Sequence, residues 1–197
     1  MPDDVPLAPV APTSHTPPPL LHRHAGDAWV ACGDHRHWGL FGAAGLLLAR
    51  REPAPADGDP GRVAAVVLQH RALWSDQGGT WGIPGGALAP HEDAVAGALR
   101  EAAEEAAVDP ADIQVLATYV LEHPAWSYTT VIAEVAPGAV VEPAAADPES
   151  LEVRWAGLTE LGALPLLGAF ADALPALLAV YEGDTTILGG PPSSGTR

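Results

Sequence analysis

The sequence predicts an α/β fold in which a mixed β-sheet is flanked by helices. Two observations lead to this prediction. Five short apolar runs are rich in β-branched or long side chains, and two stretches, one in mid-chain and one near the end, carry apolar residues at helical intervals. Strands and helices mixed in this way bury their apolar sides by packing helices on a sheet. With 197 residues, of which 48% are hydrophobic, the chain can bury a core of ordinary size.

The five expected strands have lengths and compositions typical of strands. They cover residues 43–49, 62–70, 114–122, 128–135 and 151–156. A turn is expected at residues 57–61, where the sequence reads Asp-Gly-Asp-Pro-Gly, and loops are expected at 82–90 and 143–148.

The expected helices are placed by apolar periodicity and by proline. One covers residues 92–107 and is ended by Asp109-Pro110, because the residue before a proline avoids helical geometry. Residues 161–181 predict two short helices, with a break near Pro165 or Pro175.

Composition predicts three parts along the chain. Residues 1–26 are a proline-rich flexible N-terminal arm, with seven prolines in the first 20 positions. Residues 27–182 are the folded domain. Residues 183–197 are a flexible C-terminal tail of glycine, proline, serine and threonine around one short apolar pair.

The charge balance limits the classes of partner. Nine Lys and Arg residues stand against 25 Asp and Glu residues, which gives a formal net charge of −16. Nucleic acid polymers and anionic membranes attract basic surfaces, so neither is an expected partner. The N-terminus lacks the pattern of a signal peptide, and the most apolar long stretch, residues 158–181, is interrupted by acids and prolines. We therefore expect a cytoplasmic protein.

Three carboxylates crowd one face of the mid-chain helix. On a helical wheel Glu101, Glu104 and Glu105 fall within about 100° of one another, and Arg100 lies beside them. The acids lie in the C-terminal half of the helix, where the helix dipole disfavours them, and the helix has no lysine to relieve them. An ordinary solvated face is one interpretation. A site for a hard cation such as Mg²⁺ or Mn²⁺ is the other, because such ions prefer oxygen ligands. A separate apolar stripe faces the core and consists of Val95, Leu99, Ala102 and Ala106.

This helix and the loop before it resemble the Nudix box of the MutT-like pyrophosphohydrolases. The family pattern is G-x5-E-x7-R-E-U-x-E-E-x-G-U, where U is a bulky aliphatic residue. Gly86, Glu92 and residues 100–108 match its spacing throughout and supply all five charged positions. The lead-in Trp-Gly-Ile-Pro-Gly at 81–85 is also similar. Two positions differ: Ala102 replaces a bulky aliphatic residue, and Ala107 replaces a glycine that tolerates left-handed geometry. We expect Ala107 to continue the helix instead.

The resemblance implies a Nudix α/β/α sandwich and a metal-dependent hydrolase that cleaves a diphosphate linkage in a nucleoside diphosphate derivative. Nucleoside triphosphate sanitisers of the MutT type belong to this class. The implied cofactor is Mg²⁺ or Mn²⁺. The implied catalytic residues are Glu101, Glu104, Glu105 and Arg100, and the implied metal ligands are the three glutamates and the carbonyl of Gly85. Gly86 and Glu92 are implied structural members of the box.

The resemblance leaves the finer points open. The general base is either a box glutamate or a later acid such as Glu149 or Glu152. Oxidised nucleoside triphosphates, ADP-ribose, NADH and dinucleoside polyphosphates are all open as substrates. Many relatives dimerise, so a homodimer is also open. A Nudix-fold module that binds or senses a ligand without catalysis is the alternative function, although such modules commonly lose a box carboxylate.

Other residues are weaker candidates for binding. Arg71 ends an expected strand and could meet a phosphate, while Trp74 and Trp126 lie on expected loops and could stack on a base. Glu152 is a further substrate-binding candidate. Trp81 and Trp155 are expected to pack in the core.

A short histidine-rich segment is the last candidate. Cys32, His35 and His37 are spaced as C-x2-H-x-H beside Trp38, and these are residue types that bind zinc. No fourth ligand is evident in the sequence, and the resemblance does not require zinc. A histidine-rich loop or an edge strand is therefore the favoured interpretation.

Overall fold

The computed structural model describes residues 24–52 and 61–184. Most of the expected turn at 57–61, the N-terminal arm and most of the C-terminal tail lie outside these residues. The division of the chain into three parts therefore stays a prediction.

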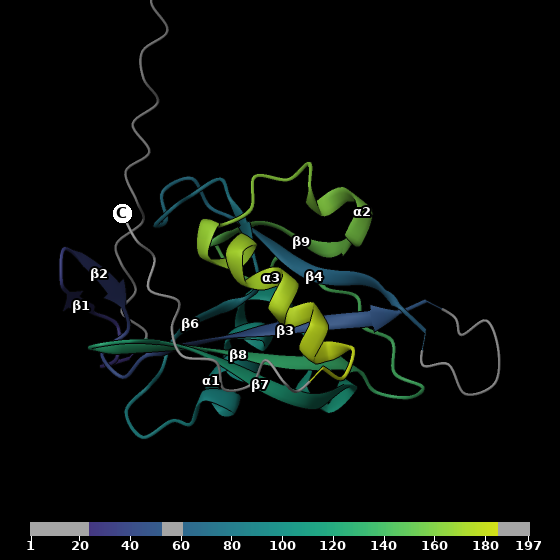
Figure 1. The fold of residues 1–197 in the computed structure, drawn as a ribbon, viewed down its shortest axis with the longest axis horizontal. Coiled ribbons are helices and arrows are strands. Elements are labelled where there is room, and N and C mark those ends of the chain that lie inside the picture. Colours follow the sequence, from purple (N-terminus) through teal and green to yellow (C-terminus); the bar gives the residue numbers. More distant parts are fainter. Residues whose placement is uncertain (1–23, 53–60, 185–197) are drawn as a thin grey trace, which may run out of the picture.

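A mixed sheet of seven strands forms the centre of the described chain, and a separate two-stranded hairpin lies at one end of it (Figure 1). The hairpin consists of β1 (Trp29–Cys32) and β2 (His35–Trp38). The sheet consists of β3 (Ala43–Arg51), β4 (Val63–Arg71), β5 (Trp81–Gly82), β6 (Gly85–Ala87), β7 (Ile113–His123), β8 (Trp126–Val135) and β9 (Ser150–Gly157). The helices are α1 (Ala94–Ala106), a single 3-10 turn at Pro110–Asp112, α2 (Leu158–Leu161) and α3 (Gly168–Tyr181).

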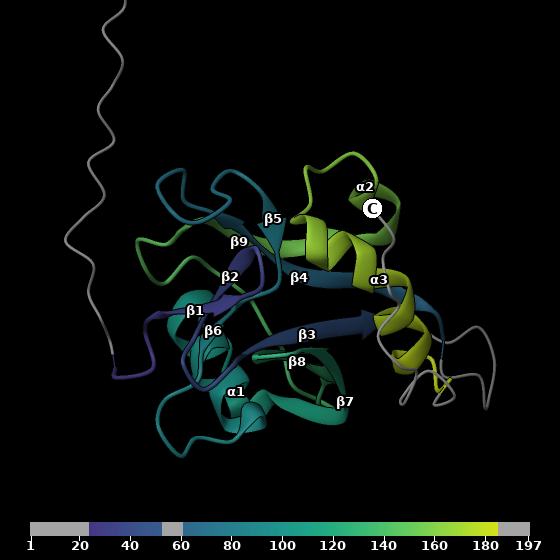
Figure 2. The same cartoon turned by 60° about the vertical axis from the view of Figure 1, so that its left-hand side comes forward.

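The two faces of the sheet are covered by different helices (Figure 2). Alternate residues of β3 point to opposite sides, so Leu47 packs in the core beneath α3, whereas Leu46 and Leu48 pack in the core against α1. The α1 side uses small residues, and Ala98, Ala102 and Ala106 are buried there. The predicted α/β architecture of helices on a mixed sheet is confirmed.

The sheet opens around the loop that precedes α1. On one side, β3 pairs with β4 through Ala49–Arg51 and with β6 through Ala43–Gly45. On the other side, it pairs in parallel with β8 from Ala43 to Ala49. β4 in turn pairs with β5 and β9. The loop from Trp81 to Ala87 therefore passes between the two halves of the sheet and carries the short strands β5 and β6, where the sequence predicted only a loop.

The five long strands are observed at the predicted places, each within two residues of its expected ends. The end of α1 differs from the prediction. Ala107 does not continue the helix: it adopts the left-handed region with φ 55° and ψ 32°, and α1 ends at Ala106. The backbone N–H of Val108 donates to the carbonyl of Ala102 at 3.2 Å, and Val108 is buried. Burial of Val108 offsets the strain at Ala107.

The C-terminal helical region breaks near Pro165, one of the two predicted places, and α3 continues through Pro175. Among the described residues, none of the helices is both long enough and apolar enough to cross a membrane.

Candidate active site on helix α1

Two of the three clustered carboxylates of α1 are buried. Glu101 is 6% exposed and Glu105 is 3% exposed, whereas the side chain of Glu104 is 41% exposed. A solvated acidic face therefore does not describe Glu101 and Glu105. Carboxylates are rarely buried to this extent without a positive partner.

Arg100 is the main positive partner of this cluster. Its guanidinium donates to both carboxylate oxygens of Glu92, at 2.8 and 2.9 Å, and to Glu101 at 2.7 Å. It also donates to the exposed Glu104 at 3.3 Å and to the carbonyl of Ala87 at 3.1 Å. The hydrogen bond from Arg100 is the largest cause that lowers the pKa of Glu92. Arg100 thus lies beside the acidic face, as the helical wheel predicts, and ties it to the loop before the helix.

Glu105 contacts backbone rather than a basic side chain. The N–H of Gly85 donates to its carboxylate at 3.0 Å. Burial, and next the negative charge of Glu101, raise the pKa of Glu105 to about 8. Two buried carboxylates, of which only Glu101 has a basic partner among the described residues, form a donor set of oxygens with excess negative charge. This donor set fits a hard divalent cation, because such an ion neutralises the charge.

The glycines of the preceding loop let the backbone reach these carboxylates. A Cβ atom on Gly86 would lie 2.7 Å from the carboxyl carbon of Glu101. A Cβ atom on Gly85 would lie 2.5 Å from the carbonyl oxygen of Ala44 on β3. Any larger residue would push the loop away from α1 or from β3. The absence of a side chain at these two glycines therefore allows the close contact between the loop, α1 and β3.

The loop before β9 adds two acids near the C-terminal end of α1. The N–H of Ala144 donates to the carbonyl of Ala106 at 3.0 Å, and the N–H of Ala146 donates to that of Glu105 at 3.1 Å. The charges of Asp147 and Glu149 further raise the pKa of Glu105. Sequence reasoning considered Glu149 as a general base and missed Asp147, because only the folded loop brings that residue to the helix.

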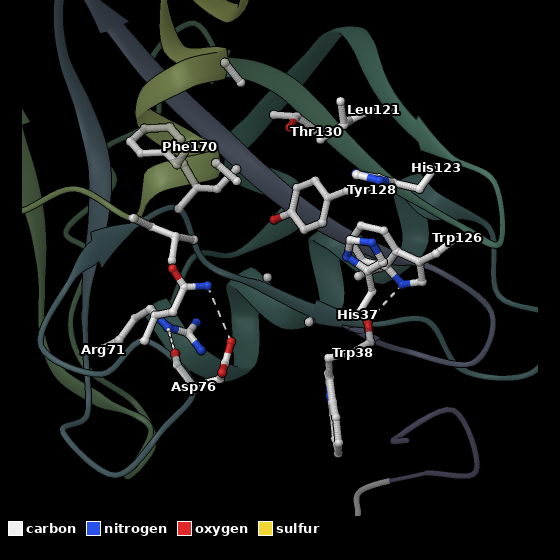
Figure 3. Close-up of a pocket in the computed structure, with 18 of the residues that line it drawn as sticks. His37, Trp38, Arg71, Asp76, Leu121, His123, Trp126, Tyr128, Thr130 and Phe170 are labelled. Carbon is white, nitrogen blue, oxygen red and sulfur yellow. Dashed lines mark hydrogen bonds between the residues drawn. The ribbon is translucent and has the colours of Figure 1, made fainter. Parts of the chain in front are cut away.

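A cavity of about 280 Å³ begins at the box loop, with Gly85 and Gly86 in its wall. Arg71 and Trp126 line it (Figure 3). Trp74 and Glu152 are not among its lining residues, and Glu152 lies against Arg154 at 3.1 Å. The aromatic side chains of the wall are those of Trp29, His37, Trp38, Tyr119, His123, Trp126, Tyr128 and Phe170.

Tyr128 is a cavity residue beside the box loop that sequence reasoning missed. Its hydroxyl lies against Gly45 and Gly85, so closely that a Cβ atom on Gly85 would be 3.0 Å from it. Burial raises the pKa of Tyr128, which keeps the phenol neutral. Tyr128 begins an expected strand, and no feature of the sequence indicates which face of the sheet that residue occupies.

Trp81 and Trp155 pack in the core, as the sequence predicts. Trp81 is 6% exposed and stacks on His70 with ring centroids 4.6 Å apart. The indole N–H of Trp155 donates to the carbonyl of Val141 at 3.0 Å, and the ring packs against the core on the α1 side.

The fold and the site together define an α/β sandwich that holds a buried acidic cluster beside an aromatic cavity. Comparison with known proteins gives the family. The family model of the NUDIX domain matches residues 54–177. The chain therefore belongs to the Nudix family, and the prediction of a MutT-like Nudix domain is confirmed. Nudix hydrolases generally need a divalent metal ion.

Relatives and solved structures agree with this membership. The chain is 48% identical over 165 residues, 82% of its length, to the "Nucleoside triphosphate pyrophosphatase/Nudix hydrolase fusion protein" of Bifidobacterium longum, and covers 33% of that protein. It is 45% identical over 156 residues, 76% of its length, to a Mycobacterium tuberculosis protein named "Putative 8-oxo-dGTP diphosphatase 3", and covers 67% of it. The crystal structure of the Nudix hydrolase RenU from M. smegmatis matches with a TM-score of 0.67 and 38% identity, over 80% of this chain and 96% of that one.

The chain spans about a third of the length of the Bifidobacterium relative. The family therefore identifies the domain, and the activity and substrates of the whole protein are treated below as proposals.

Proposed function

We propose that this protein is a nucleotide pyrophosphohydrolase that uses Mg²⁺ or Mn²⁺ to cleave a diphosphate linkage in a nucleoside diphosphate derivative. The observation that carries the proposal is the buried pair Glu101 and Glu105, held against Gly85 and Gly86 at the mouth of the cavity. A buried pair of like charges destabilises the fold unless a cation is bound. The names of the two curated relatives, which include a Nudix hydrolase fusion and a "Putative 8-oxo-dGTP diphosphatase 3", support the same class of reaction.

The residues assigned to hold the metal are Glu101 and Glu105, with Glu104 and the backbone carbonyl of Gly85 completing the set. Divalent ions in such a site offset the charge of the phosphate oxygens and lower the pKa of bound water. Mg²⁺ and Mn²⁺ both suit an all-oxygen donor set, so the geometry of the ligands does not select between them.

The chain's own residues orient this set and handle the proton. Arg100 fixes Glu101 by its 2.7 Å hydrogen bond and is itself held by Glu92. Glu105 keeps its direction through the N–H of Gly85. The position of Glu105 at the box loop, with Glu149 near enough for its charge to act on Glu105, makes these two carboxylates the candidates for accepting a proton from water.

The cavity supplies the place for the nucleoside. Trp126 stacks on His37 with ring centroids 4.2 Å apart and an interplanar angle of 5°, which forms a flat aromatic surface at one end. Arg71 lies toward the opposite side, where its Nε donates to the carbonyl of Asp76 at 3.1 Å (Figure 3). We infer that the base lies among the aromatic residues, that the phosphates lie toward the box loop, and that Arg71 contacts a phosphate.

Nucleoside triphosphates, oxidised forms included, are the substrates we place first, because the M. tuberculosis relative is named "Putative 8-oxo-dGTP diphosphatase 3". The matching experiment measures release of phosphate or pyrophosphate from a panel of canonical and oxidised triphosphates, ADP-ribose, NADH and dinucleoside polyphosphates, each with Mg²⁺ and with Mn²⁺. Glu105→Gln removes one charge from the buried pair, and Glu142→Gln changes an exposed glutamate as the matched control.

The expected result is hydrolysis by the wild type and by Glu142→Gln, and its loss in Glu105→Gln. Hydrolysis that survives in Glu105→Gln contradicts the role given to this residue. Tight binding of a panel member without any turnover supports the alternative function, a Nudix-fold module that binds or senses its ligand.

A further inference from the structure

The β1–β2 hairpin brings three metal-binding side chains to one face. Cys32 and His35 are directly opposite each other across the hairpin, and Gly33 in the two-residue turn between them has φ +66°. His37 lies two residues beyond His35 on the same strand, so it points to the same side. The C-x2-H-x-H spacing is therefore the spacing that a two-residue hairpin needs to place three ligands together.

The fourth ligand comes from the tip of a second hairpin. His123 ends β7 and pairs with Trp126 at the start of β8, again across a two-residue turn. The ligand atoms of Cys32, His35, His37 and His123 all lie within 4.8 Å of one another. Ligands on one tetrahedral zinc ion lie about 3.3–3.7 Å apart, given Zn–N of about 2.0–2.1 Å and Zn–S of about 2.3 Å. Small side-chain rotations close this difference.

The local chemistry agrees with a metal site. Cys32 is a free cysteine and is 4% exposed. His35 Nδ1 lies 2.9 Å from a carboxylate oxygen of Asp34, which accepts the Nδ1 hydrogen and leaves the lone pair on Nε2. That Nε2 atom lies 3.1 Å from Nε2 of His37. A histidine that ligates a metal commonly donates its other N–H to a carboxylate in this way.

We propose that Cys32, His35, His37 and His123 form a four-ligand zinc site that fastens the β1–β2 hairpin to the tip of the β7–β8 hairpin. An isolated two-stranded hairpin is marginally stable, and β1 and β2 form a sheet of their own. The hairpin contacts the tip of the β7–β8 hairpin through the hydrogen bond from the indole N–H of Trp126 to the carbonyl of Trp38, at 3.0 Å, and through the stacking of His37 on Trp126. A closed site of one thiolate and three imidazoles suits zinc and disfavours Mg²⁺.

This site would hold one wall of the substrate cavity. His37, His123 and Trp126 line the cavity and lie together at one end of it (Figure 3). His37 is a zinc ligand on its Nε2 side, and its ring face stacks on Trp126. The zinc site thus fixes the aromatic surface on which a ligand packs, and it stands independently of the proposed hydrolase activity. The family match begins at residue 54, so three of the four ligands lie before it.

The experiment measures the zinc content of reduced protein after dialysis against micromolar Zn²⁺. The buffer also contains millimolar Mg²⁺, which is added to occupy the acidic site. We expect about one zinc ion per chain in the wild type, retained at neutral pH. Cys32→Ser and His123→Asn should each retain less than about a tenth of it. His91→Asn is the matched control, because His91 is exposed and outside the cluster and asparagine tolerates its positive φ of 67°.

A Co²⁺ spectrum gives a second readout that does not depend on the variants' folding. Wild-type protein loaded with Co²⁺ should show a thiolate-to-cobalt charge-transfer band and the visible absorption of tetrahedral cobalt, and Zn²⁺ should displace both. Circular dichroism checks that the variants are folded. Substoichiometric zinc in the wild type, full zinc in both variants, or cobalt without a thiolate band would each overturn the proposal and would leave the acidic site untouched.

Discussion

The acidic cluster of α1 and the Cys-His cluster of the two hairpins are built in opposite ways. The carboxylates come from adjacent positions of one helix, and Arg100 fixes them from the same turn. The Cys-His cluster joins residues from β1, β2 and β7, which meet only in the folded chain. One cluster offers hard oxygen ligands and the other offers sulfur and nitrogen. The two proposals therefore place different metals at the two sides of one cavity.

The largest expected effect is a difference between variants of the two clusters in hydrolytic activity and in bound zinc. Glu105→Gln should lower kcat roughly 10²–10⁴-fold, because it removes a ligand and a candidate base, and should leave bound zinc unchanged. Cys32→Ser should remove zinc and raise KM, with kcat within about tenfold of the wild type. Steady-state hydrolysis and metal analysis of the same samples test this. Loss of both zinc and activity in both variants would show that the clusters are not independent.

A smaller effect is expected in the thermal stability of the protein with and without a metal ion at the acidic cluster. Saturating Mg²⁺ should raise the Tm of the wild type by roughly 5–10 °C, since it relieves the repulsion between Glu101 and Glu105. Glu105→Gln should respond by less than about 2 °C, and without metal it should be more stable than the wild type, because the buried charge is gone. Thermal melts of both proteins with and without Mg²⁺ measure this. A larger Mg²⁺ shift in the variant would contradict the assignment.

The ion pair between Glu92 and Arg100 predicts a specific pH dependence. Their side chains are 14% and 25% exposed, so we expect Glu92→Gln to lower the free energy of unfolding by about 1–2 kcal/mol at pH 7. Arg100 lowers the pKa of Glu92 below its ordinary 4.5, so this stabilisation is present above pH 4.5 and is lost as the pH falls through the lowered value. Urea unfolding across acidic pH should show the two proteins converging. A constant difference would mean that the pair acts by packing alone.

The smallest expected effect lies at the end of α1. Ala107→Gly should raise the free energy of unfolding by about 0.5–1 kcal/mol, because glycine adopts a φ of 55° without strain. Ala103→Gly, in the interior of the same helix, should lower it by about 1 kcal/mol. Denaturant midpoints of the two variants provide the measurement. Equal destabilisation by both changes would show that Ala107 is not strained.

The regions that could be predicted are those whose structure is determined by residues close together in the sequence. Apolar runs place the five long strands, and the spacing from Gly86 to Glu105 identifies the box without any knowledge of the fold. Arg100 beside the acids follows from helical geometry alone. The two short strands β5 and β6 could not be predicted, because their residues pair with β3 and β4 only after the sheet has formed.

The remaining differences are due to tertiary contacts. Ala107 is left-handed because Val108 must reach the core, and local propensity carries no sign of this. His123 could not be recognised as the fourth ligand, because nothing near it in the sequence points to Cys32. The same holds for Tyr128 and Asp147, which reach the box from a strand and from a loop. Trp74, in contrast, looked suitable by its residue type and lies outside the cavity wall.

The parallel pairing of β3 with β8 also bears on when the active site forms during folding. Gly45 pairs with Thr130, and Ala44 pairs with Thr129, so the contact joins segments on either side of the entire box. Long-range pairings of this kind close large loops and form slowly. We expect the local contacts of α1 to form before this pairing, so that the cavity wall to which Gly85 and Tyr128 contribute is completed only when β8 docks on β3. On this expectation, the acidic helix is present before the cavity beside it is complete.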